Sequence, residues 1–350
     1  MLARALAESF DVVVLAGGEL PPSFAPPPQV EIVPLPHLAG DELHVRRRRA
    51  DLVLEALRRS RPAVVVVELF PFGRKKLAPE LLPLLAEARS GGAVTVCSVR
   101  DILVRGRSDQ LEHDERAAAV ANAQLDAVVV HADPRFVRLE ETFRPRTPFR
   151  VPVHYSGFVV PSPPLPPAPR VRSGPLVVSA GGGRFGGELL RAAAAAQPLL
   201  TARTGTPVKL VAGPFLPDSE RRALAAEVRG RDGLELVDEV SDLAAELVDA
   251  RMSLSQCGYN TALDLLRSRV PALVVPFAAP GEDEQTRRAR LLERLGAVRV
   301  VSGRELEPAA FARIAAAIRA PVPVEVDLDG AARTREILVR LAGARARGAA

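Results

Sequence analysis

The segment PLVVSAGGGRFGGELLRAAAAA, residues 175–196, joins an apolar, β-branched run to an alanine-rich run through a glycine-rich turn. The first run favours a buried strand and the second a helix. A strand followed by a helix is the repeating unit of a parallel sheet, because a parallel neighbour can be reached only through a crossover connection. The segment therefore predicts an α/β fold.

The same alternation continues through both halves of the chain. Short apolar runs predict strands at 11–17, 30–35, 63–70, 93–99 and 127–132, then at 175–183, 208–213, 234–238, 250–255, 271–277 and 297–301. Amphipathic stretches predict helices at 42–60, 78–90, 109–124 and 134–142, then at 186–203, 218–229, 241–248, 259–268, 284–295 and 308–319. Apolar strands separated by such helices indicate parallel sheets covered on both faces. We expect two doubly wound, Rossmann-like domains facing a cleft.

A proline-rich stretch, VVPSPPLPPAPRVRSGP at 159–175, marks the boundary between the halves. Proline at this density opposes helix interiors and sheet ladders and favours an extended linker. The predicted organisation is an N-terminal domain over 1–158, a linker over 159–174 and a second domain over 175–325. A C-terminal helix over 326–350 can pack back on the N-terminal domain.

The composition is that of a globular protein, with 47% hydrophobic and 25% charged residues in 350. The net charge of +5 comes almost entirely from arginine, and only 4% of residues are aromatic, which argues against nucleic acid as a partner. No apolar run approaches the ~18 residues of a membrane span, and no signal peptide is present, so we expect a cytoplasmic protein. Arg46–Arg49 predicts a solvated helix face, with a patch for anionic lipid or phosphate at the inner membrane face as the alternative.

The glycine-rich turn is the first candidate binding segment. Gly181, Gly183 and Gly186 satisfy the G-x-G-x-x-G pattern of dinucleotide sites. The next strand, however, ends in Ala-Gly-Pro at 212–214, with no acid to hold a ribose, which disfavours NAD or FAD. Between a tight turn alone and a cradle for phosphate at a helix start, we favour the cradle.

Two later strand ends carry polar groups. In SQCGYNTALD, residues 255–264, Gly258 allows a turn, Asn260 or Thr261 can cap the next helix, and Asp264 falls one turn inside it. Asp264 can contact a ribose or can simply complement the helix dipole. In PFAAPGEDEQ, residues 276–285, Gln285 offers a donor and an acceptor to hydroxyl groups. Phosphate-, ribose- and hydroxyl-type contacts together indicate a sugar nucleotide.

These motifs, in the order AGGG, SQCGYNTALD, VPALVVPF, DEQ and LERLGAV, resemble the C-terminal donor-binding domain of GT-B glycosyltransferases of family 28. That family includes a peptidoglycan N-acetylglucosaminyltransferase. The resemblance implies diphosphate contacts at Gly181, Gly182 and Gly183, ribose contacts at Asp264 and donor-sugar contacts at Gln285. The rest of the implied donor-binding set is Arg184, Gln256, Cys257, Gly258, Asn260, Thr261, Asp283 and Glu284.

The chain also departs from that family. Gly183 stands where the peptidoglycan enzyme has Ser, and Asp264 stands where it has Glu. The segments ELFPFGRKK at 68–76 and SVRDI at 98–102 are closer to a group of predicted bacterial glycosyltransferases. A GT-B first domain normally begins with a strand and a glycine-rich loop, and this chain starts within what resembles the following helix. We therefore expect the first strand of the N-terminal domain to be missing.

The resemblance implies an inverting, metal-independent transfer from a nucleotide-sugar donor, which is UDP-linked in the family. The sequence does not identify the acceptor; relatives of the family act on lipid-linked acceptors. No cofactor is expected. Strand ends of the first domain offer Glu68, Asp101 and His131 as a general base, and we favour Asp101 or Glu68. Arg74 and Arg100 can pair with phosphates, with the acceptor, or with these carboxylates.

The remaining patterns are assigned structural roles. Asp327-Leu328-Asp329 is the only D-x-D sequence, and we interpret it as a helix cap rather than as a metal site. Cys97 and Cys257 have no disulfide or metal spacing. The alternatives to transfer are a nucleotide-sugar epimerase or hydrolase with the same fold, and a binding protein without catalysis.

Overall fold

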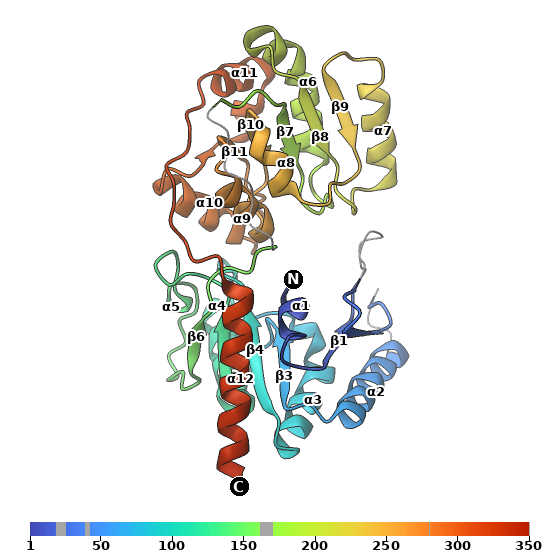
Figure 1. Ribbon diagram of the computed structural model, residues 1–350, viewed down its shortest axis with the longest axis vertical. Coiled ribbons are helices and arrows are strands. Elements are labelled where there is room, and N and C mark those ends of the chain that lie inside the picture. Colours follow the sequence, from blue (N-terminus) through green and yellow to red (C-terminus); the bar gives the residue numbers. More distant parts are fainter. Residues whose placement is uncertain (19–25, 39–42, 162–170, 280, 350) are drawn as a thin grey trace. The chain divides into compact units, whose positions relative to one another are not determined.

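The computed structural model describes residues 1–18, 26–38, 43–161, 171–279 and 281–349 (Figure 1). Most of the proline-rich linker lies outside these residues. The chain forms two compact units. Unit 1 comprises Met1–Leu103, Arg107–Pro161 and Val326–Ala350, and unit 2 comprises Val104–Gly106 and Ser162–Glu325. The last segment of the chain thus belongs to the same unit as the first.

Unit 2 contains one parallel six-stranded sheet in the order β12-β11-β10-β7-β8-β9. The strands are β7 (Leu176–Ser179), β8 (Val208–Val211), β9 (Leu234–Val237), β10 (Met252–Ser255), β11 (Ala272–Val274) and β12 (Arg299–Val300). The chain builds one half of the sheet outward from β7 and then returns to β10 to build the other half. This confirms a doubly wound sheet, whose strand order reverses between β7 and β10.

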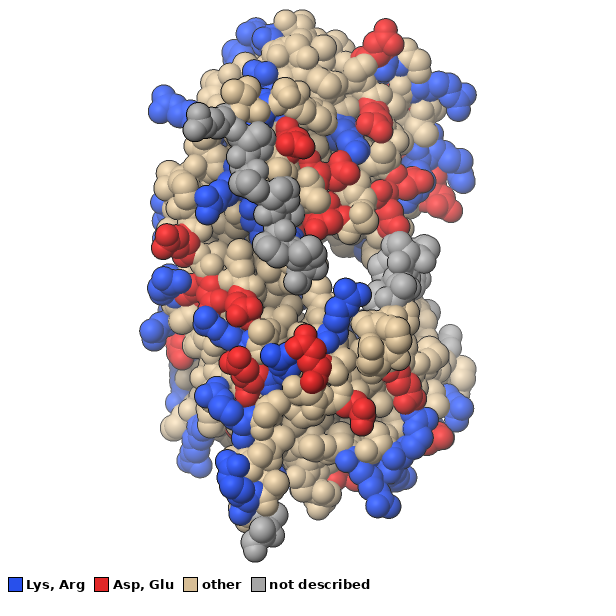
Figure 2. Space-filling model, in the orientation of Figure 1, with Lys and Arg blue, Asp and Glu red and all other residues tan. Residues whose placement is uncertain are grey.

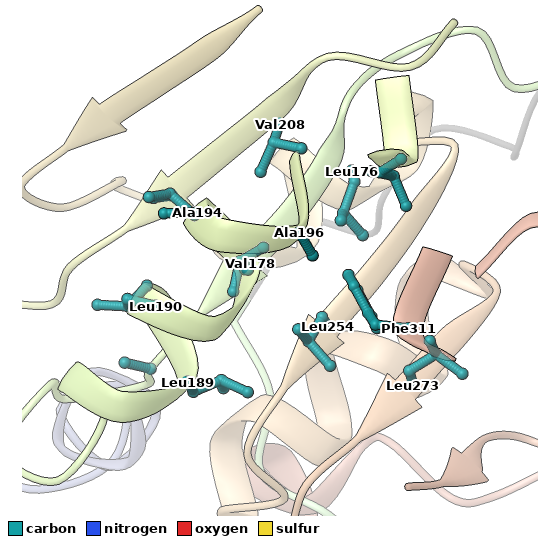
Figure 3. Packing of buried hydrophobic residues seen from close by; sticks show 14 of the residues in the cluster. Leu176, Val178, Leu189, Leu190, Ala194, Ala196, Val208, Leu254, Leu273 and Phe311 are labelled. Atoms are coloured by element: carbon teal, nitrogen blue, oxygen red, sulfur yellow. The ribbon is translucent and has the colours of Figure 1, made fainter. Parts of the chain in front are cut away.

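Helices cover both faces of this sheet. The connecting helices are α6 (Gly187–Thr204), α7 (Asp218–Val228), α8 (Leu243–Asp249), α9 (Tyr259–Ser268), α10 (Glu284–Arg294) and α11 (Pro308–Ala316). Leu190 of α6 and Phe311 of α11 pack on Leu176, Val178 and Leu254 of the strands (Figure 3). These side chains are almost fully buried, so unit 2 has a hydrophobic core of its own.

Unit 1 contains two parallel sheets instead of the single sheet that was expected. The strands β3 (Val64–Glu68), β4 (Val94–Val99), β5 (Ala127–Val130) and β6 (Val153–Tyr155) pair in that order, and β1 (Val12–Ala16) pairs with β2 (Val30–Pro34). All five residues of β1 are half-buried, and Val66 of β3 is 38% exposed. Within the described residues, β1 pairs only with β2, and β3 pairs only with β4. The two sheets are therefore separate.

The helices of unit 1 follow the predicted amphipathic segments with one exception. They are α1 (Leu2–Leu6), α2 (Leu43–Ser60), a 3-10 turn η1 (Lys75–Leu77), α3 (Ala78–Ser90), α4 (Gln110–Gln124), α5 (Leu139–Thr142) and α12 (Gly330–Ala349). The helix expected over 134–142 is wrong in its first half. Asp133 accepts the N–H of Arg135 at 2.8 Å and that of Phe136 at 2.9 Å, and this turn takes the place of the first helical turn.

The C-terminal helix α12 completes the core of unit 1. Ile337 and Leu338 are buried against Val96 and Val129 of the four-stranded sheet, together with Leu6 from the first helix. At the start of α12, Asp327 accepts the N–H of Asp329 at 3.1 Å and pairs with Arg333. The D-x-D sequence thus organises the turn that leads into this helix.

The arginine cluster does not form a continuous exposed patch. Arg49 is 2% exposed and its guanidinium makes two hydrogen bonds of 2.7 and 2.8 Å to the carboxylate of Glu80. Burial of Arg49 with a paired acid removes it from the predicted solvated face or lipid patch. Basic and acidic side chains are interspersed on the face shown in Figure 2. No helix in the described part of the chain is both long and apolar enough to cross a membrane.

Candidate functional site

The reversal of strand order between β7 and β10 defines the candidate site. In an open α/β sheet, the loops after the two strands at such a point diverge and leave a crevice beyond the carboxyl ends of the strands. Here those loops are the Gly-rich loop, residues 180–187, and the loop at 256–258, which lead into α6 and α9. Two of the three predicted binding segments are therefore brought together by the topology of the sheet.

The Gly-rich loop packs closely against the end of β8. Gly183 has φ +90°, and a Cβ atom there would lie 2.5 Å from the carbonyl oxygen of Ala212. Gly182 has no such constraint, because a Cβ atom there would make an ordinary 3.4 Å contact with the ring of Phe215. Gly183 thus serves the turn itself, whereas Gly182 leaves exposed backbone at the loop surface. Arg184 is exposed and its guanidinium lies 5.8 Å from the centre of the Phe215 ring.

Two serines lie side by side at the ends of the central strands. Ser179 of β7 and Ser255 of β10 are register partners. The hydroxyl of Ser179 accepts the N–H of Gly181 at 3.2 Å, whereas the buried hydroxyl of Ser255 has no hydrogen-bond partner among the described residues. A buried hydroxyl without a partner is costly, so a water molecule or ligand atom at this point would be stabilised. Neither serine was among the predicted site residues, although a Ser at the end of an apolar strand was a visible signal in the sequence.

Helix α9 begins one residue earlier than its expected caps. Gly258 occupies the N-cap position with an extended backbone, and no side chain caps the helix. The prediction that Asn260 or Thr261 caps α9 is therefore wrong. Both residues lie in the first turn, where Asn260 is exposed and Thr261 is buried against Gly181. The first N–H groups of the helix have no intrahelical acceptor and remain suited to an anion.

Asp264 lies on α9 one turn beyond these residues. Its side chain is 16% exposed, and Arg267 lies 3.7 Å from Asp264 and 3.8 Å from Asp242. Burial raises the pKa of Asp264 to about 7; Arg267 opposes the shift and the negative charge of Asp242 adds to it. An acid whose pKa is raised by burial beside other charged groups is a typical feature of binding and catalytic sites. The ribose role of Asp264 stays a prediction.

Gln285 has a structural role that its predicted contact with a sugar did not include. Its Oε1 atom accepts the N–H of Cys257 at 3.0 Å and the N–H of Phe277 at 3.1 Å. The side chain thus ties the loop after β10 to the loop after β11. Only its amide nitrogen remains to contact a sugar hydroxyl, so the expected donor-and-acceptor role is reduced to donation.

Cys257 supports the loop after β10 through its backbone. Its side chain is fully buried, and its carbonyl oxygen accepts a 2.8 Å hydrogen bond from Arg288 of α10. Arg288 is 1% exposed and lies 5.9 Å from the centre of the Tyr259 ring. A ligand contact through the thiol of Cys257 is excluded by this burial. The residue instead joins Gln285 and Arg288 in holding the loop.

The acids at the start of α10 are already engaged with protein groups. Asp283 accepts the N–H of Arg105 at 2.7 Å and the Nε–H of Arg287 at 2.6 Å. Glu284 lies 3.8 Å from Arg288. Gln256, in contrast, donates from Nε2 to the carbonyl oxygen of Phe185 at 2.9 Å and so links the loop after β10 to the Gly-rich loop. Asp283 and Glu284 therefore position α10 and its surroundings.

The predicted base candidates of unit 1 differ in accessibility. Asp101 is 1% exposed and its carboxylate accepts the N–H of Ile102 at 2.8 Å. The Glu68 side chain is 50% exposed and pairs with Arg74 at 2.9 Å and Arg100 at 3.5 Å. Of the two favoured carboxylates, only Glu68 can meet a ligand from solvent without rearrangement of unit 1. The two arginines pair with this carboxylate, as one of the alternatives anticipated.

A buried histidine network lies at the ends of β4, β5 and β6. The hydroxyls of Ser156 and Thr334 donate to the carbonyl oxygens of Gly157 and Gly330, at 3.0 and 2.6 Å. They therefore accept from Nδ1–H of His131, at 2.9 and 3.4 Å, which leaves Nε2 to accept from the hydroxyl of Ser98 at 2.7 Å. Burial, with help from the charge of Arg100, lowers the pKa of His131 to about 4.

This network holds a neutral imidazole against a serine hydroxyl. His131 was predicted at a strand end, but its hydroxyl partners could not be predicted from the sequence, because they come from distant segments. Among the described residues, no group of three or more His, Cys, Asp or Glu side chains is placed to hold a metal ion.

Known proteins resemble this chain in sequence mainly over unit 2. Residues 180–321 match the model of the glycosyltransferase family 28 C-terminal domain. The chain is 34% identical over 167 residues to the UDP-N-acetylglucosamine–N-acetylmuramyl-(pentapeptide) pyrophosphoryl-undecaprenol N-acetylglucosamine transferase of Ralstonia nicotianae, covering 47% of this chain and 44% of that protein. The same enzyme of Solibacter usitatus is 28% identical over 150 residues, covering 43% and 41%. The matches therefore span less than half of either relative.

The fold similarity extends over nearly the whole chain. The structure of Phytolacca americana UGT2 complexed with UDP-2fluoro-glucose and pterostilbene has a TM-score of 0.59 and 17% identity, covering 97% of this chain and 90% of that one. This similarity shows that the chain has the two-domain GT-B fold. Within this fold, residues 180–321 are the part that resembles the glycosyltransferase family 28 C-terminal domain.

Proposed function

We propose that this protein transfers a sugar from a UDP-linked donor to an acceptor hydroxyl. The observation that carries the proposal is the meeting of the Gly-rich loop and the start of α9 at the β7–β10 reversal, with Asp264 one turn inside α9. A diphosphate fits two helix N-termini, and a ribose fits a carboxyl group nearby. The names of the Ralstonia and Solibacter relatives support a UDP-linked sugar as the donor.

The departing diphosphate would be stabilised by the backbone. N–H groups at the starts of α6 and α9, and the positive ends of their dipoles, point toward the strand-end crevice of unit 2. Fixed dipoles of this kind stabilise developing negative charge without reorganisation, so the proposed reaction requires no divalent cation. Retention of activity in the presence of EDTA is the corresponding expectation.

The acceptor side of the proposal rests on unit 1 and on the relatives. A single displacement at the anomeric carbon inverts its configuration and transfers the acceptor proton to a base, for which Glu68 is the accessible candidate. The names of the relatives include a pyrophosphoryl-undecaprenol acceptor, which supports a lipid-linked acceptor. Peripheral membrane contact is part of this proposal.

The direct test is UDP binding by wild type and Asp264→Ala, measured by calorimetry. Loss of charge-assisted hydrogen bonds to the ribose weakens UDP binding by about 10- to 100-fold. Glu227→Ala, which removes an exposed acid from α7, is the matched control and keeps wild-type affinity. Unchanged affinity in Asp264→Ala with an intact fold would remove the ribose assignment.

Catalysis is tested by following UDP release from UDP-sugars with and without lipid-linked and soluble acceptors. Acceptor-dependent release supports transfer. Release at the same rate without acceptor identifies a hydrolase, and tight binding of UDP without turnover identifies a binding protein. The anomeric configuration of any product, determined by NMR, tests inversion.

A further inference from the structure

Two phenylalanine rings form an exposed stacked pair at the strand ends of unit 2. Phe185 lies in the Gly-rich loop and Phe277 follows β11; their ring centres are 5.0 Å apart and their planes differ by 17°. The side chain of Phe185 is 64% exposed, whereas Phe277 is half-buried. One face of the Phe185 ring is thus covered by Phe277, and much of the ring is open to solvent.

Site residues hold both rings in place. Gln256 donates to the carbonyl oxygen of Phe185 at 2.9 Å, and Gln285 accepts the N–H of Phe277 at 3.1 Å. The pair is therefore assembled from the loops after β7 and β11 and is fastened by side chains from the loop after β10 and from α10. Single exposed apolar residues are common on protein surfaces and need no explanation. A stacked pair whose two loops are both held by side-chain hydrogen bonds is, in contrast, a well-defined surface feature.

The chemistry around the pair selects the kind of ligand. Each glutamine uses one end of its amide to hold a loop, and neither Oε1 of Gln256 nor Nε2 of Gln285 has a hydrogen-bond partner among the described residues. A pyranose ring has an apolar face of C–H groups and a rim of hydroxyls. A flat aromatic surface bordered by one amide acceptor and one amide donor is complementary to both features.

We propose that the Phe185–Phe277 pair is the platform on which the pyranose ring of the donor lies. Phe185 is then a specificity-determining residue for the sugar, while the loop backbone and Asp264 hold the UDP portion. The inference rests on the proposed function, because it places the sugar of the same donor. It adds an aromatic contact that the motif resemblance did not include.

The experiment compares the dissociation constants of UDP, UDP-N-acetylglucosamine and UDP-glucose, measured by calorimetry. We expect wild type to bind one of the UDP-sugars more tightly than UDP. Phe185→Ala weakens binding of that UDP-sugar by about three- to tenfold, the range for an aromatic contact, and leaves UDP binding within about twofold. Phe185→Tyr, which keeps the ring, retains wild-type affinity for both. Leu199→Ala, which truncates an exposed apolar side chain on α6, is the matched control and changes neither.

Other outcomes overturn the inference in distinguishable ways. Equal weakening of UDP and of the UDP-sugar places the nucleobase on the platform and contradicts the proposal. Unchanged UDP-sugar affinity in Phe185→Ala, or no UDP-sugar bound more tightly than UDP, shows that the pair contacts no sugar, while UDP binding leaves the proposed function standing. A wild-type protein that binds neither UDP nor UDP-sugars overturns the proposed function together with this inference.

Discussion

Asp264 combines a structural cost with a proposed binding role. Its carboxyl group lies within a helix, mostly removed from water, with Arg267 and Asp242 nearby. Burial disfavours the charged form, and the pKa rises from 3.8 to about 7. A carboxyl group that is only partly ionised near neutral pH gains from a ligand whose hydroxyls donate hydrogen bonds to the carboxylate. The fold thus keeps a buried, partly ionised acid one turn inside α9.

The raised pKa predicts a pH dependence of stability. Below about pH 4 the carboxyl group is protonated in both folded and unfolded states, and its neutral form is well accommodated. As the pH rises from about 4 to about 7, the unfolded state ionises first, so the stability that depends on protonated Asp264 is lost through the folded-state pKa of about 7. With 1.36 kcal/mol for each pKa unit, the loss is on the order of 4 kcal/mol.

Asp264→Asn isolates this effect, because the amide has a similar shape and does not titrate. In urea unfolding experiments without ligand, the variant gains stability relative to wild type between pH 4 and 7, and the difference becomes constant above about pH 8. A difference between the two proteins that is independent of pH would contradict the assignment of the raised pKa to Asp264.

At the scale of elements, the loops after the strands are held by more contacts than the sequence motifs suggested. Arg288 and Gln285 from α10 support the loop after β10, and Gln256 joins that loop to the Gly-rich loop. When backbone N–H groups are held in place before a ligand arrives, the entropic cost of ordering them on binding is lower. Several residues predicted to touch the donor therefore shape the elements that would touch it.

The Gly-rich loop provides a matched pair of substitutions. Gly183→Ala introduces a side chain at φ +90° and 2.5 Å from a backbone oxygen, so the loop must move. We expect a loss of about 1–3 kcal/mol in stability and weaker UDP binding. Gly182→Ala adds a methyl group in ordinary contact distance of Phe215 and retains wild-type stability. Thermal unfolding with and without UDP measures both, and equal stability of the two variants would show that the loop adapts freely.

At the scale of the whole molecule, each unit has its own hydrophobic core. The core of unit 2 is made by strands and helices that follow one another in sequence, whereas the core of unit 1 needs α12 from the far end of the chain. Damage to the packing of α12 should therefore affect the stability of unit 1 and leave the proposed nucleotide site of unit 2 intact.

Two neighbouring residues of α12 test this independence. Leu338 is 2% exposed and packs on the four-stranded sheet, while Val339 is 44% exposed. Leu338→Ala costs about 2–5 kcal/mol of unfolding free energy, and Val339→Ala costs less than about 0.5 kcal/mol. UDP affinity, measured by calorimetry below the unfolding transition, is unchanged in both variants. A large loss of UDP affinity in Leu338→Ala would show that the units depend on one another.

The local hydrophobic pattern of the sequence was sufficient to predict most strands and helices of the fold. Apolar runs and amphipathic stretches predicted the strands and helices of unit 2 to within a few residues, because hydrophobic periodicity and propensity act over short distances. The same reasoning failed over 134–142, where the Asp133 side chain holds a turn, and at α9, where Gly258 replaces the expected caps. Hydrophobic periodicity does not predict these ends, because side-chain hydrogen bonds there depend on the local backbone geometry.

The sequence by itself determined the βα alternation, the parallel character of the sheets and the three strand-end segments of the candidate site. Only the tertiary structure decided that β1 and β2 form a sheet of their own, that Cys257 is buried and that Gln285 binds two loops. The stacking of Phe185 on Phe277 was equally beyond prediction. The physical reason is range: secondary structure follows from neighbouring residues, whereas burial, shared hydrogen bonds and ring contacts arise when segments tens of residues apart are brought to one edge of a sheet.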